Sequence, residues 1–167
     1  KYEISLKEGI EMTGNQITVQ GGTPVITLHG VNVNGSSALS IKNGANVTLI
    51  LDGENSMCST KSNCVYVQDN SYLTITSIQG DGSSAGTLRA EGNKSGGTNH
   101  AGIRGGSITV KGGTVIAKGE YEAAGIGGDA RVQNKNFSIS IEGGTVEADG
   151  GWGGAVSYTH LTLPTIR

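Results

Sequence analysis

An internal repeat constrains this chain more than any other feature of its sequence. Residues 101–119 read AGIRGGSITVKGGTVIAKG, and most of this pattern returns downstream, its head as AGIGG at 124–128 and its tail as SISIEGGTVEADG at 138–150. The two heads lie 23 residues apart and the two tails 31 residues apart, because residues 129–137 form an insertion. A repeat of this length is typical of folds in which each unit buries its apolar face only against its neighbours.

The composition and the short strand-like runs predict an all-β fold. The chain has 29 glycines and 2 prolines among 167 residues, without the Gly-X-Y period of collagen. Val, Ile, Thr and Leu alternate with polar residues between Gly-Gly, Asn-Gly and Asp-Gly turns, and there is no helix signal. Three short strands in each repeat predict a right-handed parallel β-helix, a solenoid of about five coils. The alternative is a Greek-key β-sandwich, which does not require copied triplets of strands.

The repeat also predicts which side chains stack in successive coils. Inward-facing apolar residues form ladders, and glycine pairs mark corners where φ is positive or two backbones approach closely. Lys111 and Lys118 stand where the next copy has Glu142 and Asp149, which predicts exposed ion pairs that contribute at most about 1 kcal/mol each. The predicted apolar stacks are Ile108 over Ile139, Val110 over Ile141 and Val115 over Val146.

Charge and hydropathy argue against two classes of partner. The formal net charge of -2 offers no basic face for nucleic acid. No stretch of the sequence approaches the roughly 18 apolar residues of a membrane span. We therefore expect neither a nucleic-acid partner nor a membrane span in this segment.

The repeat breaks off near the end of the sequence. Ala155 stands where the next copy of the head should begin, but Val156 follows it instead of glycine. Residues 156–167 resemble the conceptual translation of a sequencing-library adapter. We expect residues 1–155 to form one β-helix repeat segment, truncated at both ends and continued by more of the same chain, and residues 156–167 to be a non-native tail.

The chain has two cysteines, Cys58 and Cys64, which lie six residues apart. A disulfide that closes this small loop in an oxidising compartment and a pair of free thiols are equally compatible with the spacing. A metal site at these residues is not expected, because no nearby His or further Cys completes a set of four ligands.

Acidic residues are distributed at about one per coil, and several stand directly before a glycine, a position that turn formation alone explains. Alternatively, they are catalytic acids that meet only in space, as in β-helix lyases and hydrolases, where clustered acids bind calcium or flank a glycosidic bond. The acids in question are Asp52, Asp69, Asp81, Glu91, Asp129, Glu142, Glu147 and Asp149. His29 and His100 are isolated in the sequence, and no Ser or Cys nucleophile has an identifiable base. No catalytic residue is therefore assigned.

Four residues are candidates for contact with a glycan. Arg104 could serve as a cation beside an acidic sugar, and aromatic rings, among them Tyr66 and Tyr72, could stack on pyranose rings. Aromatic residues of this kind also pack at corners, which is the structural alternative. The candidate glycan-binding residues are Arg104, Tyr121, Asp129 and Trp152.

The repeats carry a resemblance to known proteins. The AGIGG and ITVKGGTVIAKG units of residues 86–155 resemble those of secreted and cell-surface β-helix proteins of gut-type Gram-positive bacteria. Residues 26–31 and 46–55 are similar to a carbohydrate-binding β-helix family associated with acidic plant polysaccharide and calcium. This resemblance implies an extracellular or cell-surface location and leaves calcium open as a cofactor, but no metal ligand can be assigned because the family's acid clusters are not visible as a compact motif.

The function expected from these features is that of a non-enzymatic extracellular module of a bacterial surface protein. It would act as a stalk or adhesive segment and bind polysaccharide, such as a host or cell-wall glycan, on a flat sheet face. The alternatives are a polysaccharide lyase or glycoside hydrolase of β-helix fold and a purely structural spacer.

Overall fold

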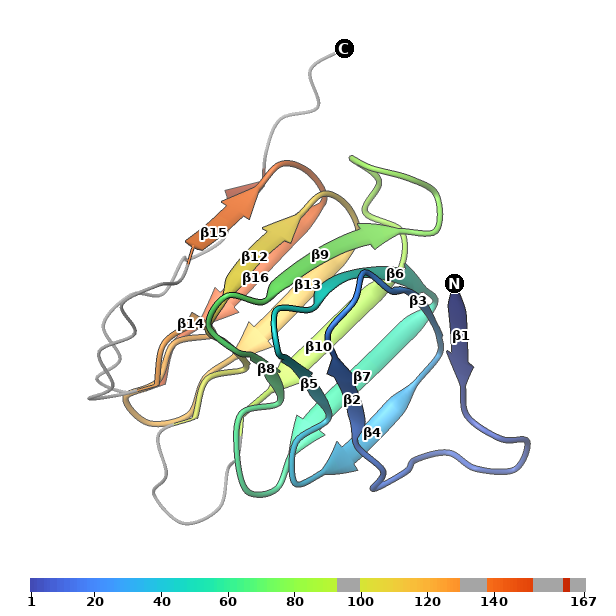
Figure 1. Ribbon diagram of the computed structural model, residues 1–167, viewed down its shortest axis with the longest axis horizontal. Coiled ribbons are helices and arrows are strands. Elements are labelled where there is room, and N and C mark those ends of the chain that lie inside the picture. Colours follow the sequence, from blue (N-terminus) through green and yellow to red (C-terminus); the bar gives the residue numbers. More distant parts are fainter. Residues whose placement is uncertain (93–99, 130–137, 152–160, 163–167) are drawn as a thin grey trace.

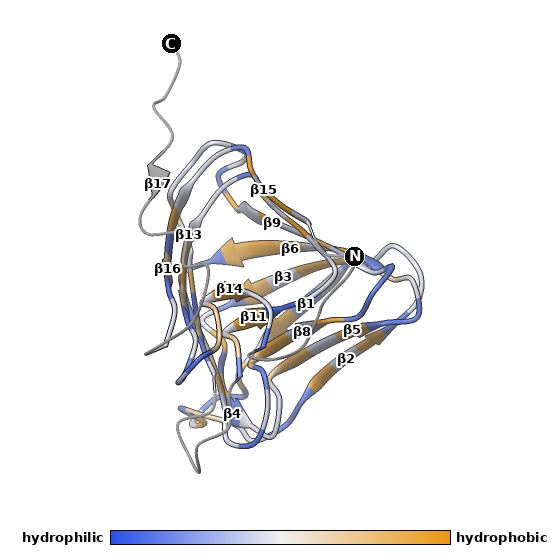
Figure 2. Ribbon diagram, turned by 90° about the vertical axis from the view of Figure 1, so that its left-hand side faces the viewer, coloured by the Kyte–Doolittle hydropathy of each residue, from blue (hydrophilic) through white to orange (hydrophobic). Residues whose placement is uncertain are grey.

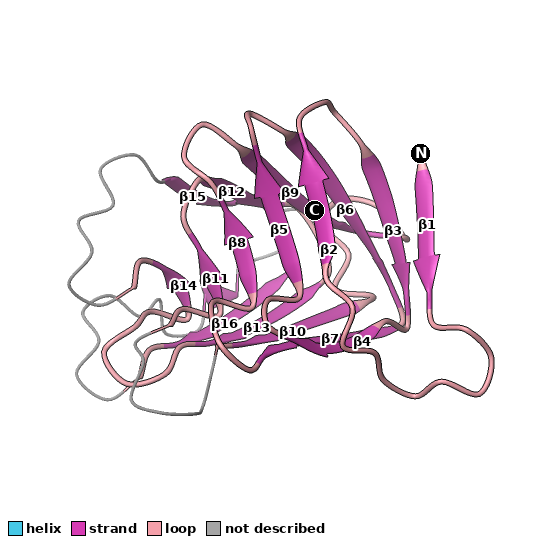
Figure 3. Ribbon diagram, turned by 60° about the horizontal axis from the view of Figure 1, so that its bottom comes forward, coloured by secondary structure: helices cyan, strands magenta, loops and turns pink. Residues whose placement is uncertain are grey.

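The computed structural model describes residues 1–92, 100–129, 138–151 and 161–162. Every regular element in these ranges is a β-strand, as Figure 3 shows. The described residues contain no helix that is long and apolar enough to cross a membrane. The prediction of an all-β fold is confirmed.

The strands form three sheets, which we call A, B and C. Sheet A contains, in spatial order, β1 (Tyr2–Ser5), β3 (Val25–His29), β6 (Asn46–Asp52), β9 (Tyr72–Ser77), β12 (Ser107–Val110) and β15 (Ser138–Ile141). Sheet B contains β4 (Asn32–Gly35), β7 (Glu54–Ser59), β10 (Thr87–Glu91), β13 (Thr114–Lys118), β16 (Thr145–Asp149) and β17 (Leu161–Thr162). Sheet C contains β2 (Ile17–Gln20), β5 (Leu39–Lys42), β8 (Val65–Val67), β11 (Ile103–Arg104) and β14 (Ile126–Gly127).

From β3 to β16 the chain visits sheets A, B and C in turn, and in each sheet the strands stack in the order in which they occur in the sequence (Figure 1). Neighbouring strands are parallel, except that β17 pairs antiparallel with β16. The three sheets form the sides of a triangular prism (Figure 2). This topology is that of a parallel β-helix and not of a Greek-key sandwich, whose sheets are antiparallel.

Alternating side chains fill the prism with a continuous apolar core. One inward row of sheet A runs through Ile26, Leu49, Ile75 and Val110 to Ile141, each residue paired with the next in strand register. The three stacks predicted from the repeat are confirmed: Ile108 pairs with Ile139, Val110 with Ile141 and Val115 with Val146. Each buried row removes apolar surface from water, which is the main stabilising contribution to a fold of this kind.

The corner between sheets A and B is built on a column of glycines in the left-handed region. Gly113 (φ +85) and Gly144 (φ +78) directly precede β13 and β16, and Gly53 (φ +68) and Gly86 (φ +77) precede β7 and β10. A Cβ at Gly86 would also collide with the backbone of Leu51. Glycine is therefore required here both by conformation and by space, as the sequence predicted.

The two predicted ion pairs are also present on the surface. Lys111 Nζ lies 3.8 Å from Glu142 Oε2, and Lys118 Nζ lies 3.9 Å from Asp149 Oδ2. Their side chains are well exposed, so each pair contributes at most about 1 kcal/mol.

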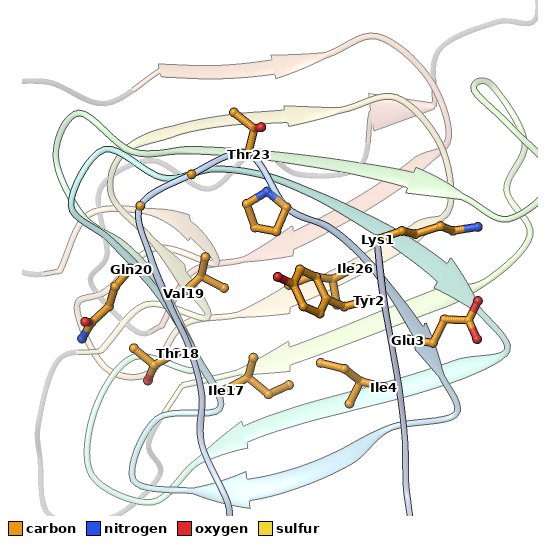
Figure 4. A pocket seen from close by; sticks show the side chains of 13 residues that line it. Lys1, Tyr2, Glu3, Ile4, Ile17, Thr18, Val19, Gln20, Thr23 and Ile26 are labelled. Carbon is orange, nitrogen blue, oxygen red and sulfur yellow. The ribbon is translucent and has the colours of Figure 1, made fainter.

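The apolar core is less well covered at its two ends. Its partly buried members are Ile4, Ile17 and Val19 at one end and Ile139 and Ile141 at the other. Between β1 and β2 a cavity of about 700 Å³ opens onto the first of these ends, and Tyr2, Ile4, Ile17 and Ile26 point into it (Figure 4). Its apolar lining belongs to the end of the core, and polar residues complete the lining.

The predicted boundary between residues 155 and 156 lies outside the described residues. The only part of the proposed tail that is described is β17, which pairs through Thr162 and Leu161 with Thr145 and Val146 of β16.

Candidate functional site

The outer face of sheet C carries the polar cluster that best fits a binding site. Thr18, Ser40, Tyr66 and Arg104 occupy one register row across β2, β5, β8 and β11. Their neighbours along each strand point inward, so this row is the outward-facing one. The strand alternation therefore places an aromatic ring and a guanidinium side by side on a flat face.

Arg104 is held between an aromatic ring and a carboxylate. Its guanidinium carbon lies 5.3 Å from the centroid of the Tyr66 ring, within the range of a cation–π interaction. Its Nε lies 3.0 Å from Asp129 Oδ2. The side chains of Arg104 and Asp129 are only 22% and 11% exposed, so their attraction is screened less by solvent than that of a surface pair.

Asp129 reaches Arg104 from the segment that follows β14. Its Oδ1 accepts a hydrogen bond from the backbone N–H of Ala101 at 3.0 Å, and its Oδ2 accepts one from Asn63 Nδ2 at 3.3 Å. Asn63 Oδ1 accepts a hydrogen bond from the same N–H of Ala101 at 2.9 Å. Asp129 thus joins three successive turns of the chain. The hydrogen bonds from Ala101 and Asn63 fix its carboxylate, which in turn orients Arg104.

His100 borders this cluster without a direct hydrogen bond to Asp129. Its Nδ1 lies 4.0 Å from Asp129 Oδ2, which is beyond hydrogen-bonding distance. Asp129 is the one carboxylate that the described contacts bring to this cluster, and they bring no Ser or Cys nucleophile to His100.

A shallow groove of about 240 Å³ lies beside the cluster. Two cationic side chains, Lys42 and Arg104, line it together with the Tyr66 ring. Lys42 makes no ion pair with any residue that the structure describes. The remaining lining residues offer hydroxyl and amide groups: Gln16, Ser37, Ser40, Ser62 and Asn63. A groove of this chemistry can hydrogen-bond a polyhydroxylated ligand. Its attraction for negative charge comes mainly from Lys42, because the charge of Arg104 is paired with Asp129.

Part of this groove is already pre-positioned by internal hydrogen bonds. Gln16 Nε2 donates to Ser40 Oγ at 2.7 Å, and the Ser37 and Ser40 hydroxyls lie 3.5 Å apart. These contacts hold polar groups at the groove wall before any ligand arrives.

The structure brings together two of the four residues that the sequence named as glycan contacts, Arg104 and Asp129. Tyr121 has a positive φ of 53° and a side chain that is 47% exposed, and the described contacts do not join this side chain to the cluster. Trp152 lies outside the described residues. Tyr66 of the aromatic set reaches the cluster, whereas Tyr72 is exposed on sheet A.

Sequence reasoning missed Lys42 and Asn63. Lys42 ends β5, in the coil that precedes Tyr66. The strand register places it near Tyr66 and Arg104, but its coil is not an obvious copy of the 101–119 repeat, so the sequence pattern does not show that register.

Both cysteines are free thiols in the structure. Cys64 is fully buried, and its thiol donates a hydrogen bond to the carbonyl oxygen of Met57 at 2.7 Å. Cys58 alternates with the buried Met57 and Ser59 and therefore lies on the outer face of β7. Burial, reinforced by the nearby Cys58, raises the pKa of the Cys64 thiol well above its usual range.

The other acids are dispersed. Asp52 Oδ2 lies 2.8 Å from His29 Nδ1 on sheet A, and Asp81 accepts a hydrogen bond from Thr76 Oγ1 at 2.7 Å. Within the described ranges, no group of three or more His, Cys, Asp or Glu side chains is placed to hold a metal ion.

Comparison with known proteins adds no further assignment. The sequence matches no protein-family model, and neither a curated protein nor a solved structure is significantly similar to it.

Proposed function

We propose that this chain is a non-enzymatic polysaccharide-binding module of a bacterial surface protein. It acts outside the cell as a stalk or adhesive segment and holds the glycan on the outer face of sheet C. The extracellular setting is supported by the resemblance of the repeats to those of secreted and cell-surface β-helix proteins.

The groove beside Arg104 is the observation that carries this proposal. It is shallow and open to one face, and it combines an aromatic ring, two cations and several hydroxyl and amide groups. Sugar recognition uses this combination, because hydroxyls need directional hydrogen-bond partners and the apolar face of a pyranose ring packs against an aromatic side chain.

Pre-organisation of Arg104 supports binding further. Asp129 and the Tyr66 ring fix the guanidinium before any ligand arrives, so little side-chain entropy remains to be lost on association. A fixed guanidinium on a sheet is also positioned more accurately than one on a free loop.

In this proposal the β-helix is right-handed and has about five coils. Crossover connections between parallel strands of one sheet are almost always right-handed. The three sheets contain five or six strands each, in chain order, which is the number that about five stacked coils would supply.

The enzymatic alternative has less support. Glycoside hydrolysis uses a pair of carboxyl groups about 5 to 10 Å apart, whereas the described contacts bring one carboxylate, Asp129, to the groove, and that carboxylate is engaged by Arg104. If Asp129 were catalytic, the wild-type protein would release unsaturated or reducing sugars from a polysaccharide, and Asp129→Asn would not. We expect no such release from either protein.

A glycan array tests the binding proposal, with wild type, Arg104→Ala and Lys111→Ala compared in calcium and then in EDTA. Lys111 is the control, because it is an exposed cation that directly follows β12, away from sheet C, and its Nζ lies 3.8 Å from Glu142 Oε2. Loss of a charge-assisted hydrogen bond is worth roughly 1.5–3 kcal/mol, so Arg104→Ala should weaken binding of the selected glycan about ten- to a hundredfold.

Silence of the wild-type protein on acidic and neutral polysaccharides, in calcium and in EDTA, would favour the structural spacer. Equal binding by Arg104→Ala and wild type would show that the glycan does not bind at the groove beside Arg104 on sheet C. Loss of binding only in EDTA would show that calcium takes part.

A further inference from the structure

A second groove, of about 530 Å³, lies on the outer face of sheet B. Its floor contains Asn32, Ser56, Arg89 and Ile116, which are register partners on β4, β7, β10 and β13. Figure 1 shows these four strands side by side. The groove therefore runs across the strands, along the direction in which the coils stack, with one floor residue for about every 4.8 Å.

The charge of this groove differs from that of the groove on sheet C. Glu11 and Glu54 line it, both are exposed, and neither forms an ion pair with a residue that the structure describes. The only cation in the lining, Arg89, is neutralised by Glu91 at 2.8 Å. The groove is therefore net acidic, and it complements a ligand that carries positive charge.

The floor of the groove is rigid, and its backbone has no hydrogen-bonding capacity to spare along β7 and β10. Each of these strands pairs with a parallel neighbour on both sides. The buried Asn55 side chain joins successive coils, since it accepts from the N–H of Val31 at 2.8 Å and donates to the carbonyl oxygen of Thr87 at 3.2 Å. A peptide that binds by strand addition needs a free sheet edge, so this outer face, which lies away from the sheet edges, favours a ligand held through side chains.

We propose that the sheet B groove binds a linear amino-polysaccharide, laid along the coil axis with protonated amines at Glu11 and Glu54. Successive sugars of an extended chain repeat at a distance comparable to the strand spacing, so their hydroxyl groups meet the floor residues Asn32 and Ser56 in turn. Ile116 gives one ring an apolar contact. This site is independent of the groove at Arg104 and is selective for the opposite charge.

The test is titration calorimetry with short glucosamine oligomers at mildly acid pH, where their amines are protonated. The proteins are wild type, the double variant Glu11→Gln/Glu54→Gln, and Glu147→Gln. Glu147 is the matched control, because it is an exposed glutamate in the same register row, paired with Ile116, beyond the groove. Each exposed charge contact is worth up to about 1 kcal/mol, so the double variant should bind up to about tenfold more weakly, while Glu147→Gln should bind as wild type does.

Three results would overturn the assignment. The first is that fully N-acetylated oligomers bind wild type as tightly as glucosamine oligomers do, and the second is that the double variant and the control have equal affinity. The third is that an oligolysine of the same charge binds as tightly as the glucosamine oligomer. Because the substituted glutamates are exposed, both variants should keep the melting temperature of wild type. Arg104→Ala, included in the same series, should bind glucosamine oligomers normally. The absence of binding at the sheet B groove can then be distinguished from the absence of binding at the site on sheet C.

Discussion

At the residue scale, the corner glycines act through two effects that the structure allows to be separated. Gly22 and Gly86 have nearly the same φ, +76 and +77. A Cβ at Gly22 would meet nothing within 4 Å, whereas a Cβ at Gly86 would strike the backbone of Leu51 in the preceding coil. The first glycine is required for its conformation alone, and the second also for the close approach of two coils.

This pair gives a quantitative prediction. Gly22→Ala should lower the free energy of unfolding by about 1–2 kcal/mol, the cost of a left-handed L-residue. Gly86→Ala should cost at least about 1–3 kcal/mol more, because the added methyl group forces two backbones apart. Denaturant unfolding of both variants measures the difference, and equal destabilisation would mean that coil contact at Gly86 is unimportant.

The buried thiol of Cys64 predicts a pH dependence of stability. Its pKa is raised in the folded protein, so the folded state holds the proton after the unfolded chain has lost it. The stability contributed by the neutral thiol is complete below the usual thiol pKa, near 8.5, and is lost above it by up to about 1.4 kcal/mol per pH unit until the raised folded pKa is reached.

Comparison of wild type with Cys64→Ala isolates this effect, because all other titrating groups are shared. Between neutral and alkaline pH the stability of wild type should fall more steeply than that of the variant. Parallel stability curves would contradict the assignment of a buried neutral thiol. In native protein, a thiol reagent should modify Cys58 well before Cys64.

At the element scale, the strands of sheet A separate core from surface by alternation. Leu49 in β6 is 1% exposed and lies in register between Ile26 and Ile75, whereas its neighbour Ile50 faces outward and is only partly buried. Each coil contributes one such inward residue to a row, so a cavity in β6 affects the coils on both sides.

Leu49→Ala should therefore destabilise the protein by about 2–5 kcal/mol, the usual cost of a large-to-small change in a core. Ile50→Ala removes a side chain of similar size from the outer face and should cost clearly less. Denaturant titration of the two variants provides the comparison, and a cost for Ile50→Ala that equals or exceeds that for Leu49→Ala would contradict the assigned inward face of β6.

The strand register could be predicted from the sequence in some elements and not in others. Residues 107–118 and 138–149 are close copies, so their register and the two surface ion pairs could be predicted. The site at Arg104 could be predicted only in part. Its second anchor, Asp129, opens an insertion outside the copied pattern, and contacts such as that of Asn63 with Asp129 span 66 residues, a separation that no local pattern encodes.

At the scale of the whole molecule, the prism carries different chemistry on different faces. The groove on sheet C is lined by Lys42 and Arg104, and the groove on sheet B by Glu11 and Glu54. Rows of side chains on a stacked scaffold suit extended polymers more than small substrates, since each coil adds a similar contact to the last.

The glycan is proposed to bind at the row of Ser40, Tyr66 and Arg104 on sheet C. The most direct measurement is a titration of the array-selected glycan into isotope-labelled protein, followed by amide chemical shifts in NMR spectra. We expect shift changes at these three residues and at Lys42, and unchanged shifts for the outer row of sheet A around Thr74. Shift changes centred on sheet A, or none on sheet C at saturating glycan, would rule out a binding site at this row.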